Sequence, residues 1–236
     1  MSEIVRTCYT AIFGQYDELK QPFAIPQHWK FICYTDNENI ELPKGNVWEI
    51  RKVPVMDLGP AKTARWYKIN FFEHIDTEDS LWIDATFFIN VDLNRWWRRF
   101  QEPMTVIKHP FDDCIYTDIK SCMKGGKGDF WTLIKQAQDY KDIVPENNGL
   151  ISSGILMRRN TPEVRKLCKA WWAEVEKYTE RDQIAFGRAA LDNKIFHVIE
   201  WDYTKQNEFI HCPHLNKPWR SARYRQIIDE YGPKSA

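Results

Sequence analysis

Segments of β-forming residues alternate with segments of helical periodicity along this chain, and this alternation limits the fold more than any other feature. The predicted strands are Ile4–Phe13, Lys30–Asp36, Asn46–Pro54, Ser80–Asp84 with an apolar extension through Ile89, Thr105–Ile107, Cys114–Tyr116, Leu150–Arg158 and Phe196–Ile199. The predicted helices are Ala61–His74, Leu93–Gln101, Phe130–Lys141, Thr161–Tyr178 and Arg181–Leu191. Because strands that alternate with helices form mostly parallel sheets flanked by helices, the fold class is α/β.

The 236 residues suffice for one α/β domain, and we expect a single domain over 1–236. Lys plus Arg equal Asp plus Glu at 33 each, so no overall charge attracts nucleic acid or membrane. The six cysteines show no metal-binding spacing and several lie in apolar segments, which is typical of a reducing compartment. With no signal-peptide core and no long apolar stretch, we expect a cytoplasmic protein without a membrane span.

Acidic residues stand at the ends of two predicted strands, Asp36 and Asp84. In parallel sheets, ligands bind beyond the carboxyl ends of the strands. A carboxylate fixed there suits a divalent cation that approaches together with phosphates. The alternative is that Asp84 only stabilises the turn that follows it.

The segment His211–Trp219 (HCPHLNKPW) is the second candidate for site chemistry. An imidazole and, six residues later, a lysine could bring a metal ligand and a phosphate-binding cation into one pocket. Taken alone the pattern is weak, because a histidine near the C-terminus is usually solvated or packed.

Together, these two segments resemble the retaining GT-A glycosyltransferases of family eight, the glycogenin and galactosyltransferase type. That family carries an Asp-x-Asp motif, an Asp-Leu pair eight residues after the first Asp, and a late His-x-x-Gly-x-x-Lys-Pro-Trp. The matching residues here are Asp84, Asp92-Leu93, His211 and Lys217-Pro218-Trp219. The chain departs from the pattern at Thr86, in place of the second Asp, and at His214, in place of the Gly.

Seven ordered segments resemble the domain-of-unknown-function 616 group of glycosyltransferase-like proteins. They are Tyr9–Leu19, Phe31–Asp36, Pro60–Ile69, Leu81–Ala85, His109–Asp118, Asn148–Asn160 and Glu180–Phe186. The resemblance covers most of the chain. It implies a GT-A fold, a Rossmann-like nucleotide-diphospho-sugar transferase domain.

The resemblance also implies a site for a nucleotide-sugar donor. The residues expected to bind it are Ala11, Phe13, Tyr16, Asp36, Lys62, Arg65, Lys68, Asp84, His109, Asp113 and Lys217. Asp84 and His211 would hold a divalent cation, Mn²⁺ or Mg²⁺, and Lys217 would neutralise the departing diphosphate. Thr86 and His214 weaken the expectation of a metal. For Lys62, Arg65 and Lys68 a solvated helix face is the alternative, and for His109 and Asp113 a turn-stabilising pair.

Arg181-Asp182-Gln183 resembles the Asp-Gln step that lies beside the reacting carbon in retaining enzymes. Asp182 and Gln183 are therefore the expected catalytic residues. The alternative is an Asp near a helix start that interacts with the helix dipole. Ile184 stands where a second Asp often follows, so no protein nucleophile is evident, and retention is implied by the family alone.

Two segments combine basic and aromatic residues, Arg95–Arg99 and Trp219–Arg225. They could bind nucleic-acid phosphates and stack on bases. The alternative is a helix face whose Trp side chains point inward and whose Arg side chains point outward. The predicted function is transfer of a sugar from a nucleoside diphosphate, UDP first, to a hydroxyl acceptor. A glycan, a lipid-linked sugar, a hydroxymethylated DNA base, a protein and a small molecule remain open as acceptors. The alternatives are a hydrolase on the same scaffold and a non-catalytic nucleotide- or carbohydrate-binding module.

Overall fold

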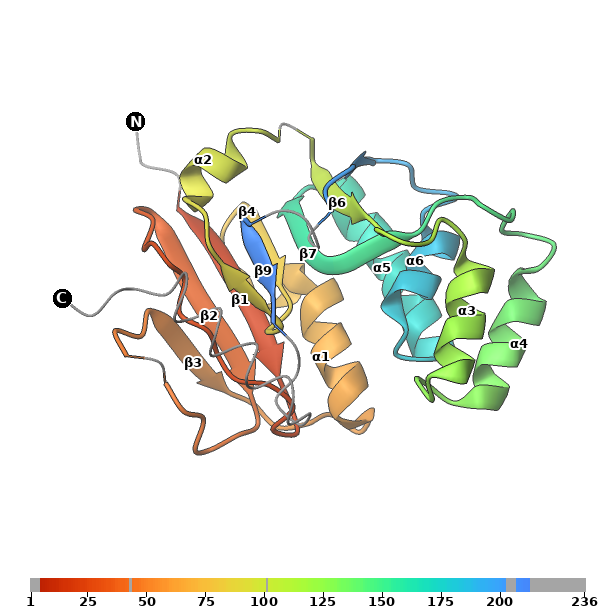
Figure 1. The fold of residues 1–236 in the computed structure, drawn as a ribbon, viewed down its shortest axis with the longest axis horizontal. Helices are drawn as coiled ribbons and strands as arrows, with labels where there is room; N and C mark the ends of the chain where they lie inside the picture. Colours follow the sequence, from red (N-terminus) through yellow and green to blue (C-terminus); the bar gives the residue numbers. More distant parts are fainter. Residues whose placement is uncertain (1–4, 43, 101, 203–206, 213–236) are drawn as a thin grey trace.

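The computed structural model describes residues 5–42, 44–100, 102–202 and 207–212, and in these ranges the chain forms one central sheet with the strand order β3-β2-β1-β4-β7-β6-β8 (Figure 1). Its strands are β1 (Arg6–Ile12), β2 (Trp29–Thr35), β3 (Trp48–Lys52), β4 (Asp79–Ile83), β6 (Met104–Lys108), β7 (Ile151–Arg159) and β8 (Phe196–Ile199). A separate antiparallel pair joins β5 (Phe87–Ile89) to β9 (Phe209–His211).

The sheet is mostly parallel, as the sequence predicts. The pairs β1–β2, β2–β3, β1–β4 and β6–β8 run parallel, while β7 runs antiparallel to both β4 and β6. From β1 the chain builds β2 and β3 toward one edge and then places β4 on the other side of β1. The strand order therefore reverses between β1 and β4, and at their carboxyl ends such a reversal leaves room for a ligand.

The helices in the described ranges are α1 (Gly59–Ile69), α2 (Leu93–Trp97), α3 (Ile115–Lys124), α4 (Phe130–Tyr140), α5 (Pro162–Lys177) and α6 (Asp182–Ala189), with a 3-10 turn at Phe71–Glu73 after α1. Three of them, α2, α4 and α5, begin after a capping side chain. The side chains of Asp92, Asp129 and Thr161 accept hydrogen bonds from the first turns of α2, α4 and α5. These bonds satisfy amide groups that the helix itself leaves without acceptors.

The alternation of side chains along each strand builds two cores, one on each face of the sheet. In β4, Trp82 packs on the face that α1, α5 and α6 cover, while Leu81 and Ile83 pack on the face that α2 and the β5–β9 pair cover. A smaller core lies under α3 and α4, around Leu133 and Tyr140. The site residues described below are attached to these packed layers.

Two predictions about elements were wrong, and one strand was not predicted. Cys114–Tyr116 is not a strand but the start of α3, whose buried positions Ile115, Asp118, Ile119 and Cys122 follow helical spacing. The predicted extension of the fourth strand through Ile89 breaks after Ile83, and β5 begins only at Phe87. The strand β9 was not predicted, because a three-residue segment carries too little periodicity.

Within the described ranges, each helix falls short of the length and apolar character that a bilayer span requires. The six cysteines are all buried.

Candidate functional site

Asp84 follows the last residue of β4, at the point where the strand order reverses. Its backbone N–H donates to the Gly154 carbonyl over 2.7 Å. Its Oδ1 accepts a 2.7 Å hydrogen bond from Trp82 Nε1, because residues two apart on a strand share a face. About a third of the Asp84 side chain, 30%, is exposed. The carboxylate is thus fixed at the carboxyl end of β4 and remains accessible to solvent.

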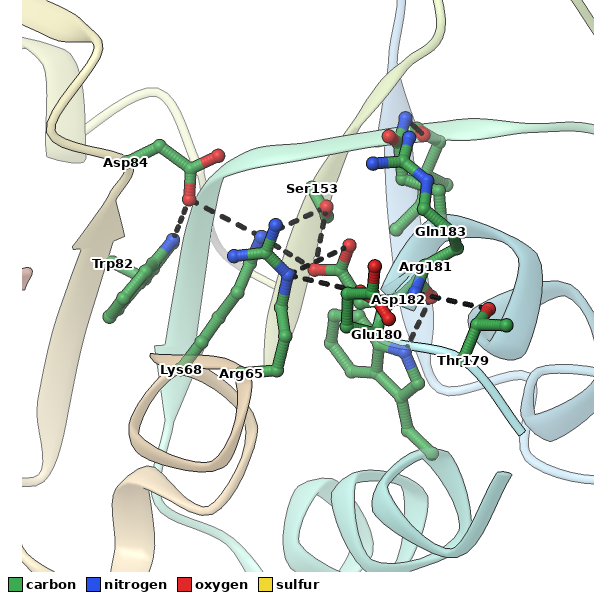
Figure 2. Close-up of polar contacts among 12 residues, drawn as sticks. Arg65, Lys68, Trp82, Asp84, Ser153, Thr179, Glu180, Arg181, Asp182 and Gln183 are labelled. Carbon is green, nitrogen blue, oxygen red and sulfur yellow. Dashed lines mark hydrogen bonds and ion pairs between the residues drawn. The ribbon is translucent and has the colours of Figure 1, made fainter. Parts of the chain in front are cut away.

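Lys68, near the end of α1, lies at the centre of the site with its side chain 1% exposed. Its Nζ lies 2.6 Å from Asp182 Oδ2, 2.9 Å from Ser153 Oγ and 3.3 Å from Asp84 Oδ1. The ammonium therefore joins α1 to the two carboxylates and to β7 (Figure 2). A buried lysine needs such partners, since an unpaired charge would be costly to desolvate.

The core holds the last turn of α1 in place below Lys68. Tyr9 Oη donates to the Lys68 carbonyl over 3.1 Å, and Arg158 donates in turn to Tyr9 Oη. Arg158 is almost fully buried, and its guanidinium lies 4.4 Å from the centre of the Phe71 ring. These contacts from β1 and β7 fix the backbone from which the Lys68 side chain extends.

Asp182, the first residue of α6, is 2% exposed and has several polar partners. Besides Lys68, its carboxylate accepts from Ser153 Oγ at 2.9 Å and lies 3.4 Å from Arg65 Nε, while its carbonyl accepts from Trp171 Nε1 at 2.7 Å. Burial by itself raises the pKa of Asp182, but the charges of Lys68 and Arg65 outweigh it and hold the pKa well below its usual value. The carboxylate is an anion at neutral pH.

These five residues, Arg65, Lys68, Asp84, Ser153 and Asp182, form what we call the buried ion cluster. Its two cations and two carboxylates come from α1, α6 and the end of β4, which lie far apart in the sequence (Figure 2). The predicted residues Arg65, Lys68, Asp84 and Asp182 are thus brought together. Arg65 and Asp84 remain the more exposed members, at 23% and 30%.

The loop after β1 and the end of β2 meet beside this cluster. Gly14 N donates to Asp36 Oδ1 over 2.9 Å, and Gly14 has a φ of +67°, which favours glycine. Phe13 is buried and stacks on Tyr67 of α1. The predicted nucleotide-binding residues differ in accessibility, because Ala11 is half-buried and Tyr16 is exposed.

The β5–β9 pair brings His211 to the Asp84 turn. His211 lies opposite Phe87 in the ladder, and Cys212 N donates to the Thr86 carbonyl over 2.6 Å. The His211 imidazole packs edge-on against the Phe87 ring with centroids 5.2 Å apart. His211 therefore lies near the turn that follows Asp84, and a role of the two residues as metal ligands stays a prediction. In the described part of the chain, no three His, Cys, Asp or Glu side chains gather as a metal site.

Several predicted site residues have other partners in the structure. Lys62 Nζ donates to the carbonyls of Glu176 and Tyr178 at the end of α5, at 3.1 and 2.9 Å. That placement fits a role in capping α5, and a role toward the donor stays a prediction. Gln183 Nε2 donates to the Ile151 carbonyl over 2.7 Å, at the start of β7.

The turn after β6 holds His109. Its Nδ1 accepts from the backbone N–H of Asp112 at 3.1 Å, which supports the turn-stabilising alternative, although here the partner is not Asp113. Asp113 is exposed. Lys217, Pro218, Trp219 and His214, and with them the segment Trp219–Arg225, lie outside the described residues.

In the other basic-aromatic segment, Trp96 and Trp97 are buried in the core. The inward-facing alternative is thereby confirmed for these two rings, which are not available to stack on bases.

Sequence reasoning missed two residues at the site. Lys20, in the segment after β1, is buried, and its Nζ lies 2.5 Å from the Ala85 carbonyl and 3.2 Å from the Glu18 carbonyl. Burial lowers the pKa of Lys20. Ser153, within the segment Asn148–Asn160, was not predicted to contact Lys68 or Asp182. Neither position carries a motif, and both become visible only when the strands are placed side by side.

Comparisons with known proteins identify the family and the fold of the chain. The TOD1/MUCI70 glycosyltransferase-like domain matches residues 74–212, more than half of the chain. The chain belongs to this family. The finer resemblance to family eight and to the domain-of-unknown-function 616 group stays a prediction.

Two individual proteins are similar to the chain. The probable hexosyltransferase MUCI70 of Arabidopsis thaliana is 22% identical over 259 residues, which cover 94% of this chain but only 44% of that protein. The crystal structure of the glycosyltransferase GlyE of Streptococcus pneumoniae TIGR4 aligns with a TM-score of 0.52 at 13% identity, over 99% of this chain and 61% of that one. The second likeness supports the predicted α/β GT-A fold.

Proposed function

We propose that the chain transfers a glycosyl group from a nucleoside diphosphate, with UDP as the first candidate, to a hydroxyl acceptor. One observation carries the proposal: Asp84 stands at the carboxyl end of β4, where the strand order reverses, and is oriented by Trp82 and Lys68 while still partly exposed. The family membership and the name of the Arabidopsis thaliana relative, a probable hexosyltransferase, support the same activity. We also propose that 1–236 acts as one domain.

The reaction requires charge stabilisation at the diphosphate. When the bond from the sugar to the diphosphate breaks, negative charge builds on the diphosphate oxygens, and a cation placed there in advance lowers the barrier. Arg65 is the more exposed cation of the buried ion cluster, so we assign it to the diphosphate. Lys68 is too deeply buried to meet the donor directly and instead orients Asp84.

The residues present fit a divalent cation only in part. Both described hydrogen bonds to the Asp84 carboxylate end on Oδ1, so Oδ2 is the oxygen that could bind a metal, and His211 is the second candidate ligand. Mg²⁺ and Mn²⁺ sites often combine one or two carboxylates with substrate phosphates and water, so these two side chains would suffice once the donor is bound. The cation would supply positive charge at the diphosphate.

We assign Asp182 a positioning role. Its carboxylate is 2% exposed and already accepts from Lys68 and Ser153, so a contact with the sugar would require these bonds to part. Gln183, the next residue, uses its Nε2 to bind the start of β7. Its Oε1 is the atom that we assign to the donor sugar or the acceptor.

The direct test is release of UDP from a panel of UDP-hexoses and UDP-pentoses, measured with and without a mixture of sugar acceptors. Glycosyl transfer predicts UDP release that rises when an acceptor is added and that is lost in Asp84→Asn. Equal release with and without acceptor would support the hydrolase alternative. Binding of UDP without release from any donor would support a non-catalytic module.

A further inference from the structure

A second polar cluster lies between α3, α6 and the turn after β6, next to the buried ion cluster but not part of it. It contains His109, Asp118, Cys122 and Arg181, which we call the α3–α6 cluster. Arg181 directly precedes Asp182 in the chain, so the two clusters share the start of α6 (Figure 2). None of the bonds described for the buried ion cluster includes His109, Asp118 or Cys122.

Asp118 is the unusual member. It lies in the first turn of α3 and is 8% exposed. Its Oδ1 has only the Cys122 thiol as a partner, at 3.8 Å, and its Oδ2 has no hydrogen-bond donor among the described residues. A buried carboxylate oxygen without a donor is rare and costs free energy, so a missing partner is the expected explanation.

Arg181 and His109 supply N–H donors for which the described residues offer no acceptor. Arg181 Nε donates to Cys122 Sγ over 3.1 Å, and no hydrogen bond to a described residue is made by its two terminal nitrogens. The Nδ1 of His109 accepts from a backbone N–H, which leaves the proton on Nε2 as a donor. Burial keeps the pKa of His109 low, so the ring is neutral at pH 7.

The cluster does not have the form of a structural ion pair. In the described part of the chain, no ion pair within 4 Å joins Asp118 to Arg181, and the Cys122 thiol stands between them instead. The Asp118 carboxylate nevertheless acts on both neighbours. Burial by itself lowers the pKa of Arg181, but Cys122 and Asp118 raise it, and Asp118 also opposes the lowering of the pKa of His109 by burial. A charged donor and a charged acceptor thus lie close together without being paired.

We infer that Asp118, Arg181 and His109 bind hydroxyl groups of the sugar acceptor. A carboxylate accepts from hydroxyls while a guanidinium and an imidazole N–H donate to them, and neighbouring hydroxyls on a pyranose ring need both kinds of partner. The Asp118 charge disfavours a phosphate, so a nucleic-acid backbone does not fit here. This inference rests on the proposed function, because it assigns to that site the class of acceptor, a sugar, and its position beside α6.

Saturation-transfer NMR with methyl glycosides of glucose, galactose, mannose and xylose tests the inference, together with a UDP titration. Wild-type protein should show transfer to at least one glycoside, and Asp118→Asn should weaken that binding about tenfold or more while the Kd for UDP is unchanged. Asp142→Asn, an exposed carboxylate after α4, is the matched control and should bind like wild type. Circular dichroism checks that the variants are folded, and Arg181→Lys replaces Asp118→Asn if the latter fails to fold.

Two outcomes overturn the inference: no glycoside binds to the wild type, or Asp118→Asn binds glycosides as the wild type does. The proposed function fails separately, through absence of binding by UDP, GDP and ADP. If glycoside binding depends on Asp118 while none of these three nucleotides binds, the α3–α6 cluster stands as a sugar site and the transferase proposal falls.

Discussion

The pair formed by Lys68 and Asp182 provides the sharpest prediction about the energetics of this site. The two side chains are 1% and 3% exposed, and their charged atoms lie 2.6 Å apart. Lys68→Met removes the cation at similar side-chain length and leaves a buried carboxylate whose other charged partner is Arg65, 3.4 Å away. Breaking one partner of a buried pair costs about 3–5 kcal/mol, so we expect that loss in the free energy of unfolding.

The double variant Lys68→Met with Asp182→Asn separates the pair from its surroundings. Without the lysine, a neutral amide is easier to bury than a carboxylate, so the double variant should be more stable than the sum of the two single losses predicts. A coupling of about 2–3 kcal/mol is expected from urea denaturation followed by circular dichroism. The exposed pair of Lys108 and Glu200, 2.8 Å apart, is the matched control and should show no measurable coupling.

The reasoning would be refuted if Lys68→Met cost less than about 1 kcal/mol, or if the coupling were no larger than in the control pair. Either result would mean that Asp182 is not held as a buried anion. The positioning role assigned to it would then be lost.

Two further predictions concern the structure around the site. Burial lowers the pKa of His74 from 6.5 to about 4, so between these pH values the unfolded chain binds a proton that the folded chain does not. The contribution of His74 to the free energy of unfolding should be fully present above pH 6.5 and should fall by up to about 3 kcal/mol toward pH 4. His74→Gln should remove this pH dependence, and the exposed control His197→Gln should keep it. Gly154→Ala places a methyl 2.6 Å from a Phe87 ring carbon, so we expect a loss of about 1–3 kcal/mol in the free energy of unfolding. UDP binding should also weaken, because Phe87 belongs to the segment between Asp84 and the strand paired with His211. Unchanged stability in a urea titration would contradict this packing.

Much of the fold could be predicted because strand and helix periods are local properties. The strands that end at Asp36 and Asp84 were predicted to within a residue or two, and so were the long helix after Thr161 and the helix that begins near Asp182. The direction of β7 could not be predicted from the sequence, because a buried apolar strand has the same residue pattern whether its neighbours run parallel or antiparallel to it.

The candidate site was predicted as a list of residues but not as an arrangement. The spacing of Lys62, Arg65 and Lys68 placed them on one side of a helix, yet only Arg65 and Lys68 meet Asp182, whereas Lys62 caps α5. That difference depends on where α5 and α6 pack against α1, which no local pattern encodes. Asp118 was not predicted, because the residues just before it, Cys114–Tyr116, were predicted to be a strand and its position on a helix was not recognised.

The central claim is that a nucleoside diphosphate binds around Asp84, at the carboxyl end of β4. Isothermal titration of UDP, GDP and ADP, each with Mn²⁺ and with EDTA, tests it most directly when wild type and Asp84→Asn are compared. We predict that one of the three binds to wild type and that Asp84→Asn weakens that binding about tenfold or more. Absence of binding by all three, or equal affinity in Asp84→Asn, would contradict the claim.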